Sequence, residues 1–211
     1  MWVIVRKNPE EAFAINAESV KRLLRHTEGT QFIYISTDYV FSGLSGNYDE
    51  LSVTDPRTVY GKSKLLGEWY CEMFSQNFMI VRTSGIYGAN CGWLQWLRGE
   101  LDSTEEIVCF EDAHNSPTYV DNLGEMIIEM IKCGFSGHIN LSGPEKLNRY
   151  ELYKKVFTHY NSDTNRLLPG SSKGAMPYDV SLSNNLYTEL TDKNPWSVEK
   201  GLRDLSQKEQ S

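Results

Sequence analysis

Short apolar runs alternate with amphipathic stretches along the first half of the chain. Residues 31–36 (QFIYIS) and 77–84 (NFMIVRTS) are apolar over the length of a strand, which is typical of parallel strands buried on both faces. Residues 9–26 begin with proline and acids and end with basic residues, so they predict a helix, as does the pattern of residues 58–74. This rhythm predicts an α/β fold with a parallel sheet covered by helices on both faces.

Beyond residue 88 the same alternation continues less regularly. The expected helices there are 92–101, 121–133 and 148–160, and the expected strands are 105–112 and 137–143. Residues 167–177 (LLPGSSKGAMP) are rich in glycine, serine and proline, and they predict a loop. The tail after Trp196 is polar, which predicts a frayed end.

The composition argues against several function classes. A net charge of −7 disfavours a surface that binds nucleic acid or an anionic membrane. The four cysteines form no CxxC pair and the four histidines are scattered, so no metal site is expected. No apolar run is long enough to span a bilayer, and a cytoplasmic protein is the default expectation.

Three residues form a candidate catalytic group. Tyr60 and Lys64 are four positions apart and share one face of an expected helix, while Thr37 follows an expected strand. A free tyrosine has a pKa of about 10, and a lysine ammonium on the same face is expected to lower it. Such a tyrosine can donate a proton to a carbonyl oxygen that the threonine hydroxyl also holds. Taken alone, Tyr-x-x-x-Lys is a common surface pair, so its position behind ISTDYVF carries the prediction.

These motifs resemble a known family. The segments ISTDYVFSG (35–43), YGKSKLLGE (60–68) and VRTSGIYG (81–88) resemble the extended short-chain dehydrogenase/reductase superfamily, and within it the dTDP-4-dehydrorhamnose reductases. The resemblance extends from about Asn8 to Glu189. It implies a partial Rossmann-like parallel sheet in residues 1–88. Residues 89–211 would complete the sheet and form a small C-terminal substrate-binding lobe.

The resemblance also implies roles for individual residues. It implies that Thr37, Tyr60 and Lys64 are catalytic. The residues implied to contact NADPH or NADH are Ser36, Tyr60 and Lys64. The residues implied to contact a nucleotide-sugar substrate are Thr37, Asp38, Ser84, Gly85, Pro117 and Thr118. For Pro117 and Thr118 a simple turn is an equal alternative. Asn16 matches an asparagine near the family's active site, although a place in the helix interior is an equal alternative. Arg82 is expected to be structural.

Two features depart from the family pattern. Gly85 stands where the family often carries a tryptophan that contacts the sugar, and Trp93 and Trp96 have the spacing of helix core residues. No G-x-x-G-x-x-G motif is present, and Gly43 and Gly46 are better explained by a turn. By resemblance, the chain is expected to begin near the family's fourth strand. That would expose a sheet edge, which a second copy or a protein partner is expected to cover.

Three hypotheses therefore stand. The first is an NAD(P)H-dependent reductase of a 4-keto nucleotide sugar. The second is a non-catalytic regulatory subunit like the beta subunit of methionine adenosyltransferase, which the missing glycine motif and Gly85 favour. The third is an inactive fragment of such a reductase. None of the three calls for nucleic acid, a membrane or a metal.

Overall fold

The computed structural model describes residues 8–210, and its centre is a parallel sheet. The strands are β1 (Phe32–Thr37), β2 (Phe78–Thr83) and β7 (Gly137–Asn140), in the order β1-β2-β7. Both neighbouring pairs are parallel, so Thr37 and Thr83 lie side by side where their strands end. The predicted α/β fold with a parallel sheet is confirmed.

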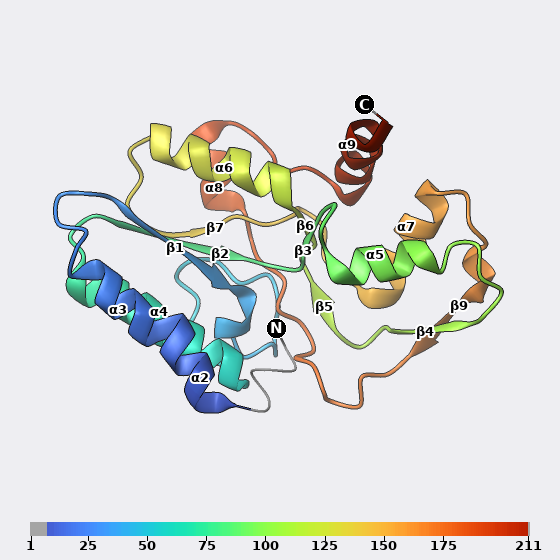
Figure 1. Ribbon diagram of the computed structural model, residues 1–211, viewed down its shortest axis with the longest axis horizontal. Helices are drawn as coiled ribbons and strands as arrows, with labels where there is room; N and C mark the ends of the chain where they lie inside the picture. The colour runs from blue at the N-terminus through green and yellow to red at the C-terminus, as the bar shows by residue number, and fades with distance from the viewer. Residues whose placement is uncertain (1–7, 211) are drawn as a thin grey trace.

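Helices cover both faces of this sheet (Figure 1). On one face lie α2 (Pro9–Phe13), the π-helical turn η1 (Ala14–Glu18), α3 (Ser19–Leu24) and α4 (Val59–Phe74). On the other face lie α6 (Val120–Lys132) and α8 (Asn185–Thr191). The residues of β2 show why both layers are needed. Met79 packs against the α6 side and Ile80 against the α3 and α4 side, and both are fully buried.

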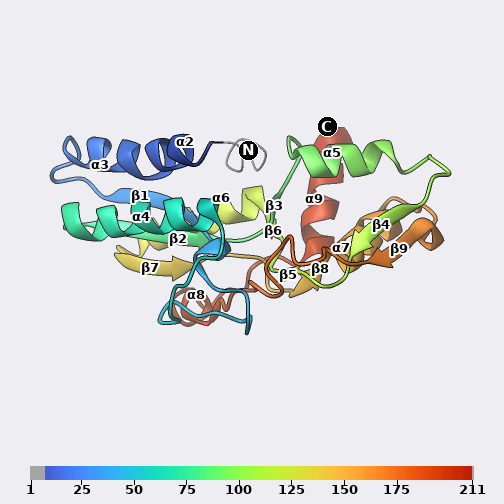
Figure 2. The same ribbon diagram turned by 90° about the horizontal axis from the view of Figure 1, so that it is seen from below.

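A second, smaller lobe lies beside the sheet (Figure 2). Its larger elements are α5 (Gly92–Gly99), β4 (Ile107–Phe110), α7 (Arg149–His159), β9 (Leu167–Gly170) and α9 (Val198–Gln210). Its shorter elements are β3 (Ile86–Tyr87), β5 (His114–Asn115), β6 (Thr118–Tyr119), β8 (Leu147–Asn148) and η3 (Thr164–Arg166). Strands β3 and β6 pair in parallel and join the lobe to the sheet.

The structure corrects two sequence predictions in this lobe. Residues 167–170, expected to be loop, form β9, which pairs in parallel with β4. The tail after Trp196, expected to fray, forms α9, whose Val198, Leu202 and Leu205 are buried in the core of the lobe. These apolar residues recur at helical spacing on one face of α9, and packing of that face against α7 stabilises the helix.

The sheet is completed by segments that follow residue 88. Strand β7 belongs to the sheet, and helices α6 and α8 pack on it. Helices α5, α7 and α9 belong to the smaller lobe (Figure 1). The division at residue 88 itself stays a prediction.

Candidate active site

The site begins where β1 ends. Thr37 is the last residue of the strand, and its Oγ1 accepts a hydrogen bond from the Tyr39 backbone N–H at 3.3 Å. This bond caps the short 3₁₀ turn η2 (Asp38–Val40). The turn places the Thr37 and Asp38 side chains at the carboxyl edge of the parallel sheet, where binding sites of such folds are found.

Helix α4 starts against this turn. The Thr58 hydroxyl caps the helix by accepting a hydrogen bond from the Gly61 N–H at 3.0 Å. A side chain at Gly61 would place its Cβ 2.1 Å from the Tyr39 carbonyl oxygen, so only glycine permits this contact. Tyr60 is therefore held beside the strand end, where its hydroxyl is hydrogen-bonded to Thr37.

Lys64 lies one turn further along α4 and points toward β1. Its Nζ donates a hydrogen bond to the Ile35 carbonyl oxygen at 2.6 Å and lies 4.0 Å from the centre of the Tyr34 ring. Burial lowers the pKa of Lys64 to about 8, while the nearby Glu68 carboxylate opposes this shift. Lys64 therefore remains mainly an ammonium at neutral pH and becomes the neutral amine above about pH 8.

The pKa of Tyr60 moves in the direction opposite to the sequence prediction. Burial raises it and the Asp38 carboxylate raises it further, while the hydrogen bond with Thr37 lowers it. The prediction that Lys64 makes this phenol more acidic is wrong for the described structure. The physical reason is that the Lys64 ammonium is directed to the Ile35 carbonyl and the Tyr34 ring.

Asp38 is the buried acid of the site. Its side chain is only 2% exposed, and it accepts hydrogen bonds from Thr37 Oγ1 at 2.9 Å and from Ser84 Oγ at 2.5 Å. Burial raises its pKa from 3.8 to about 7, although these hydrogen bonds act to lower it. Its predicted contact with a sugar stays a prediction, since both of its oxygens already have partners within the protein.

Beneath the site lies a buried ion pair. Glu68 and Arg82 are 0% and 4% exposed, with Arg82 Nη2 at 2.8 Å and Nε at 3.2 Å from the Glu68 carboxylate oxygens. The Ser36 hydroxyl donates to the same carboxylate. Arg82 thus has the structural role that the sequence predicted. The implied cofactor contact of Ser36 stays a prediction, and its hydroxyl is already engaged.

Asn16 lies in the π-helical turn η1, a local distortion often found at functional sites. Its side-chain amide donates to the Ser63 hydroxyl at 3.0 Å, and its carbonyl oxygen accepts from the Tyr34 hydroxyl at 2.8 Å. Gly67 allows this contact, because a Cβ there would lie 2.5 Å from the Asn16 carbonyl oxygen. Asn16 therefore braces the inner face of α4.

The other implied substrate residues surround Gly85. Its backbone has φ of +48°, and a Cβ would lie 2.8 Å from the Asn115 Nδ2, so the position favours glycine. Thr118, which is 1% exposed, accepts a hydrogen bond from the Gly143 N–H and is internal to the lobe junction. Trp93 stacks on Tyr153 in the smaller lobe, in agreement with the core role expected from its spacing. The same expectation is wrong for Trp96, whose side chain is 49% exposed.

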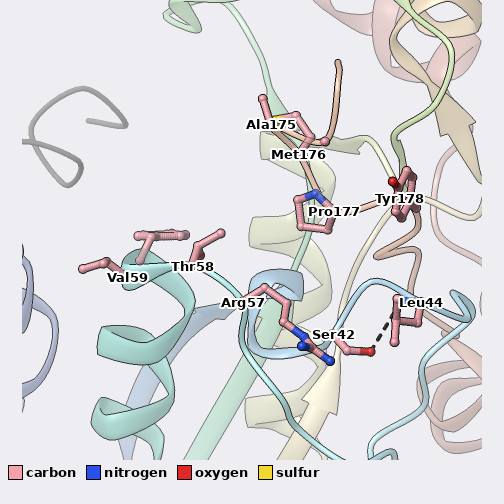
Figure 3. Close-up of a pocket in the computed structure, with 11 residues that line it drawn as sticks. Ser42, Leu44, Arg57, Thr58, Val59, Ala175, Met176, Pro177 and Tyr178 are labelled. Atoms are coloured by element: carbon pink, nitrogen blue, oxygen red, sulfur yellow. Dashed lines mark hydrogen bonds between the residues drawn. The ribbon is translucent and has the colours of Figure 1, made fainter. Parts of the chain in front are cut away.

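A pocket of about 650 Å³ opens beside Tyr60 (Figure 3). One wall is the start of α4, with Arg57, Thr58 and Val59, and the facing wall is the loop of residues 174–178. The remaining lining residues are Ser42 and Leu44. Its volume is in the range of pockets that bind small molecules. Among the site residues predicted from sequence, Tyr60 lines this pocket.

Sequence reasoning missed Arg57 and the 174–178 loop. The loop reaches the site because it packs on Gly43, whose φ is +75° and where a Cβ would lie 2.4 Å from the Pro177 Cβ. Gly43 and Gly46 both have positive φ, which confirms the turn reading of this pair. The glycine-rich composition of this segment predicts a loop, but composition does not show which part of the fold the loop contacts.

Two absences are reported for residues 8–210. In this part of the chain, no three histidine, cysteine, aspartate or glutamate side chains are grouped as a metal site would need. None of its helices combines the length and the apolar character needed to cross a membrane.

Comparison with known proteins places the chain. The sequence model of the RmlD substrate binding domain matches residues 4–204. The chain belongs to this family. The dTDP-4-dehydrorhamnose reductase of Sinorhizobium fredii is 31% identical over 183 residues, which are 81% of this chain and 61% of that protein. Methionine adenosyltransferase 2 subunit beta of Danio rerio is 25% identical over 193 residues, which are 82% of this chain and 56% of that protein.

A solved structure agrees with the RmlD substrate binding domain assignment. The dTDP-4-dehydrorhamnose reductase of Bacillus anthracis, determined in complex with NADP, superimposes with a TM-score of 0.91 at 29% identity. The match covers 97% of this chain and 76% of that one. This chain spans about half the length of the curated relatives it matches, with 37%, 53% and 58% of three of them covered. The resemblance to this reductase family is confirmed.

Proposed function

We propose that this chain carries the proton-donating side of a reductase that uses NADPH or NADH to reduce the keto group of a 4-keto nucleotide sugar. The observation that supports this most is the position of the Tyr60 hydroxyl. It is hydrogen-bonded to Thr37 at the carboxyl end of β1, and Tyr60 is one of the residues that line a pocket of about 650 Å³. A phenol in that position can protonate a carbonyl oxygen held in the pocket.

Each residue has a defined part in this proposal. Tyr60 gives its proton to the carbonyl oxygen of the sugar, and Thr37 orients the Tyr60 hydroxyl. Lys64 would hold the ribose of the nicotinamide nucleotide, which supplies the hydride when bound. The residues present fit that end of the cofactor, because an ammonium has three N–H donors and the Ile35 carbonyl takes one of them. The sequence contains no G-x-x-G-x-x-G motif, so binding of the pyrophosphate has to be measured directly.

The test is a calorimetric titration of the purified chain with NADPH. We expect Lys64→Met to weaken binding at least about tenfold, because the ribose loses a charged hydrogen bond worth about 1.5–3 kcal/mol. Lys62→Met is the matched control, since Lys62 is exposed on the same helix and should leave the affinity unchanged. A chain that binds no NADPH at millimolar concentration would contradict independent reductase activity and favour the fragment hypothesis.

A regulatory role is the second candidate, and the Danio rerio subunit beta supports it. In that case this chain would act through its surface on a methionine adenosyltransferase catalytic subunit. Sedimentation of a mixture of the two chains tests this role. A complex whose affinity is unchanged by Tyr60→Phe, together with no turnover of a keto sugar, would favour regulation over catalysis.

A further inference from the structure

Asp38 is a buried carboxyl group, and residues 8–210 place no cation in an ion pair with it. Its oxygens lie 2.9 Å from Thr37 Oγ1 and 2.5 Å from Ser84 Oγ, and its side chain is 2% exposed. Within residues 8–210 no lysine, arginine or histidine forms an ion pair with it. Burial without a counter-ion favours the neutral acid over the carboxylate.

The hydrogen bonds fix which oxygen of Asp38 carries the proton. Ser84 Oγ accepts a hydrogen bond from the Ser116 N–H at 3.0 Å, so the single hydroxyl proton of Ser84 is directed to Asp38 Oδ2. Because Oδ2 already receives this proton, the acid proton of neutral Asp38 resides on Oδ1. That oxygen faces Thr37.

Thr37 stands between the two acids. Its Oγ1 accepts from the Tyr39 N–H, adjoins Asp38 Oδ1 and is hydrogen-bonded to the Tyr60 hydroxyl. A hydroxyl has one proton to give. When Asp38 is ionised, Thr37 donates to Asp38 and accepts from Tyr60. When Asp38 is neutral, Thr37 accepts from Asp38 and donates to Tyr60.

We propose that Asp38 is a proton reservoir for Tyr60, connected to it through the Thr37 hydroxyl. This proposal rests on the proposed function. After Tyr60 has given its proton to the sugar oxygen, the Thr37 O–H bond breaks and a Tyr60 O–H bond forms. At the same time the Asp38 O–H bond breaks and a Thr37 O–H bond forms, so the negative charge moves from the phenolate to the carboxylate. Between turnovers, water in the pocket returns a proton to Asp38 through the same two hydroxyls.

The electrostatics agree with this assignment. Asp38 has its pKa raised to about 7, so it holds a proton near neutral pH. Tyr60 is the ionisable side chain that faces it from α4, and the Ser84 and Ser116 groups on its other side are neutral. The Asp38 carboxylate raises the pKa of Tyr60, so a proton moves readily from neutral Asp38 to a newly formed Tyr60 phenolate.

The first test needs neither cofactor nor substrate. Carbon-13 NMR of aspartate-labelled chain should show the Asp38 carboxyl titrating near pH 7, and Thr37→Val should raise that pKa by removing a donor to the carboxylate. Thr37→Ser keeps the hydroxyl and should restore the original value. Titration of Asp38 at its ordinary pKa of about 3.9, or no response to Thr37→Val, would overturn the proposal.

The second test measures turnover with NADPH and a 4-keto nucleotide sugar. Asp38→Asn should reduce the turnover rate at least about tenfold without changing NADPH affinity, and Thr37→Ser should keep most of the rate. The wild-type rate should fall as the pH rises through about 7, and Asp38→Asn should remove that fall. A purely structural role would leave the pH profile intact, and an Asp38→Asn variant with the wild-type profile refutes the reservoir. Should the wild-type chain not turn over, the proposed function fails while the NMR titration still decides the link between Asp38 and Thr37.

Discussion

Replacing Asp38 with asparagine should change how the stability of the chain depends on pH. The folded state raises the pKa of this carboxyl from 3.8 to about 7. An acid with a raised folded-state pKa contributes full stability below its unfolded pKa, and that contribution is lost as the pH rises toward the folded value. This pKa rise corresponds to a loss of about 4 kcal/mol in the free energy of unfolding over the whole titration. About 2.5 kcal/mol of that loss occurs between about pH 5 and pH 8.

Urea denaturation at these two pH values measures the effect. Other groups titrate in both proteins, so the difference between wild type and Asp38→Asn isolates Asp38. On going from about pH 5 to pH 8, we expect the free energy of unfolding of the variant to increase by about 2.5 kcal/mol relative to that of wild type. The exposed Asp49, whose pKa its hydrogen bond from Ser52 lowers, is the control, because Asp49→Asn should give a small change of opposite sign. Parallel pH profiles for wild type and Asp38→Asn would refute the buried, unpaired state of this acid.

Three substitutions test the packing that positions the site, each by urea denaturation. Gly67→Ala should cost about 1–3 kcal/mol, because the new Cβ would lie 2.3 Å from the Tyr34 hydroxyl, whereas Gly124→Ala on α6 meets open space and should be neutral or stabilising. Arg82→Met should cost about 3–5 kcal/mol, because it leaves a buried carboxylate without its cation, and a cost under about 1 kcal/mol would contradict the ion pair. Leu202→Ala should cost about 2–5 kcal/mol if α9 is packed as described, whereas a frayed tail would show no effect.

The sheet layer could be predicted from sequence because its signals are local. β1 and β2 are continuous apolar runs and α4 has the residue pattern of a helix, so these local patterns predicted all three nearly to the residue. β9 was missed because the LLPG segment has proline and glycine and becomes a strand only when β4 lies beside it. α9 was missed because the segment has few apolar residues, and the helix is stabilised by their packing against the smaller lobe.

The places of Thr37 and Tyr60 in the fold could be predicted from sequence, but the direction of the Tyr60 pKa shift could not. Thr37 and Tyr60 are at a strand end and a helix start, and the topology of a parallel sheet brings these together. The rise in the pKa of Tyr60 comes from burial of its side chain and from the buried Asp38 carboxylate, and neither can be read from residue spacing. The loop that closes the pocket comes from a distant part of the chain, so its approach to α4 requires the fold.

The most direct test of the account compares Tyr60→Phe with wild type in the NADPH-dependent reduction of a 4-keto nucleotide sugar. Tyr70→Phe is the matched control, because Tyr70 lies on the same helix and its hydroxyl contacts Glu18 away from the pocket. We expect Tyr60→Phe to reduce turnover about 10²-fold or more while NADPH affinity stays near wild type, and Tyr70→Phe to keep the wild-type rate. A Tyr60→Phe variant that turns over at the wild-type rate would contradict the assignment of Tyr60 as the proton donor.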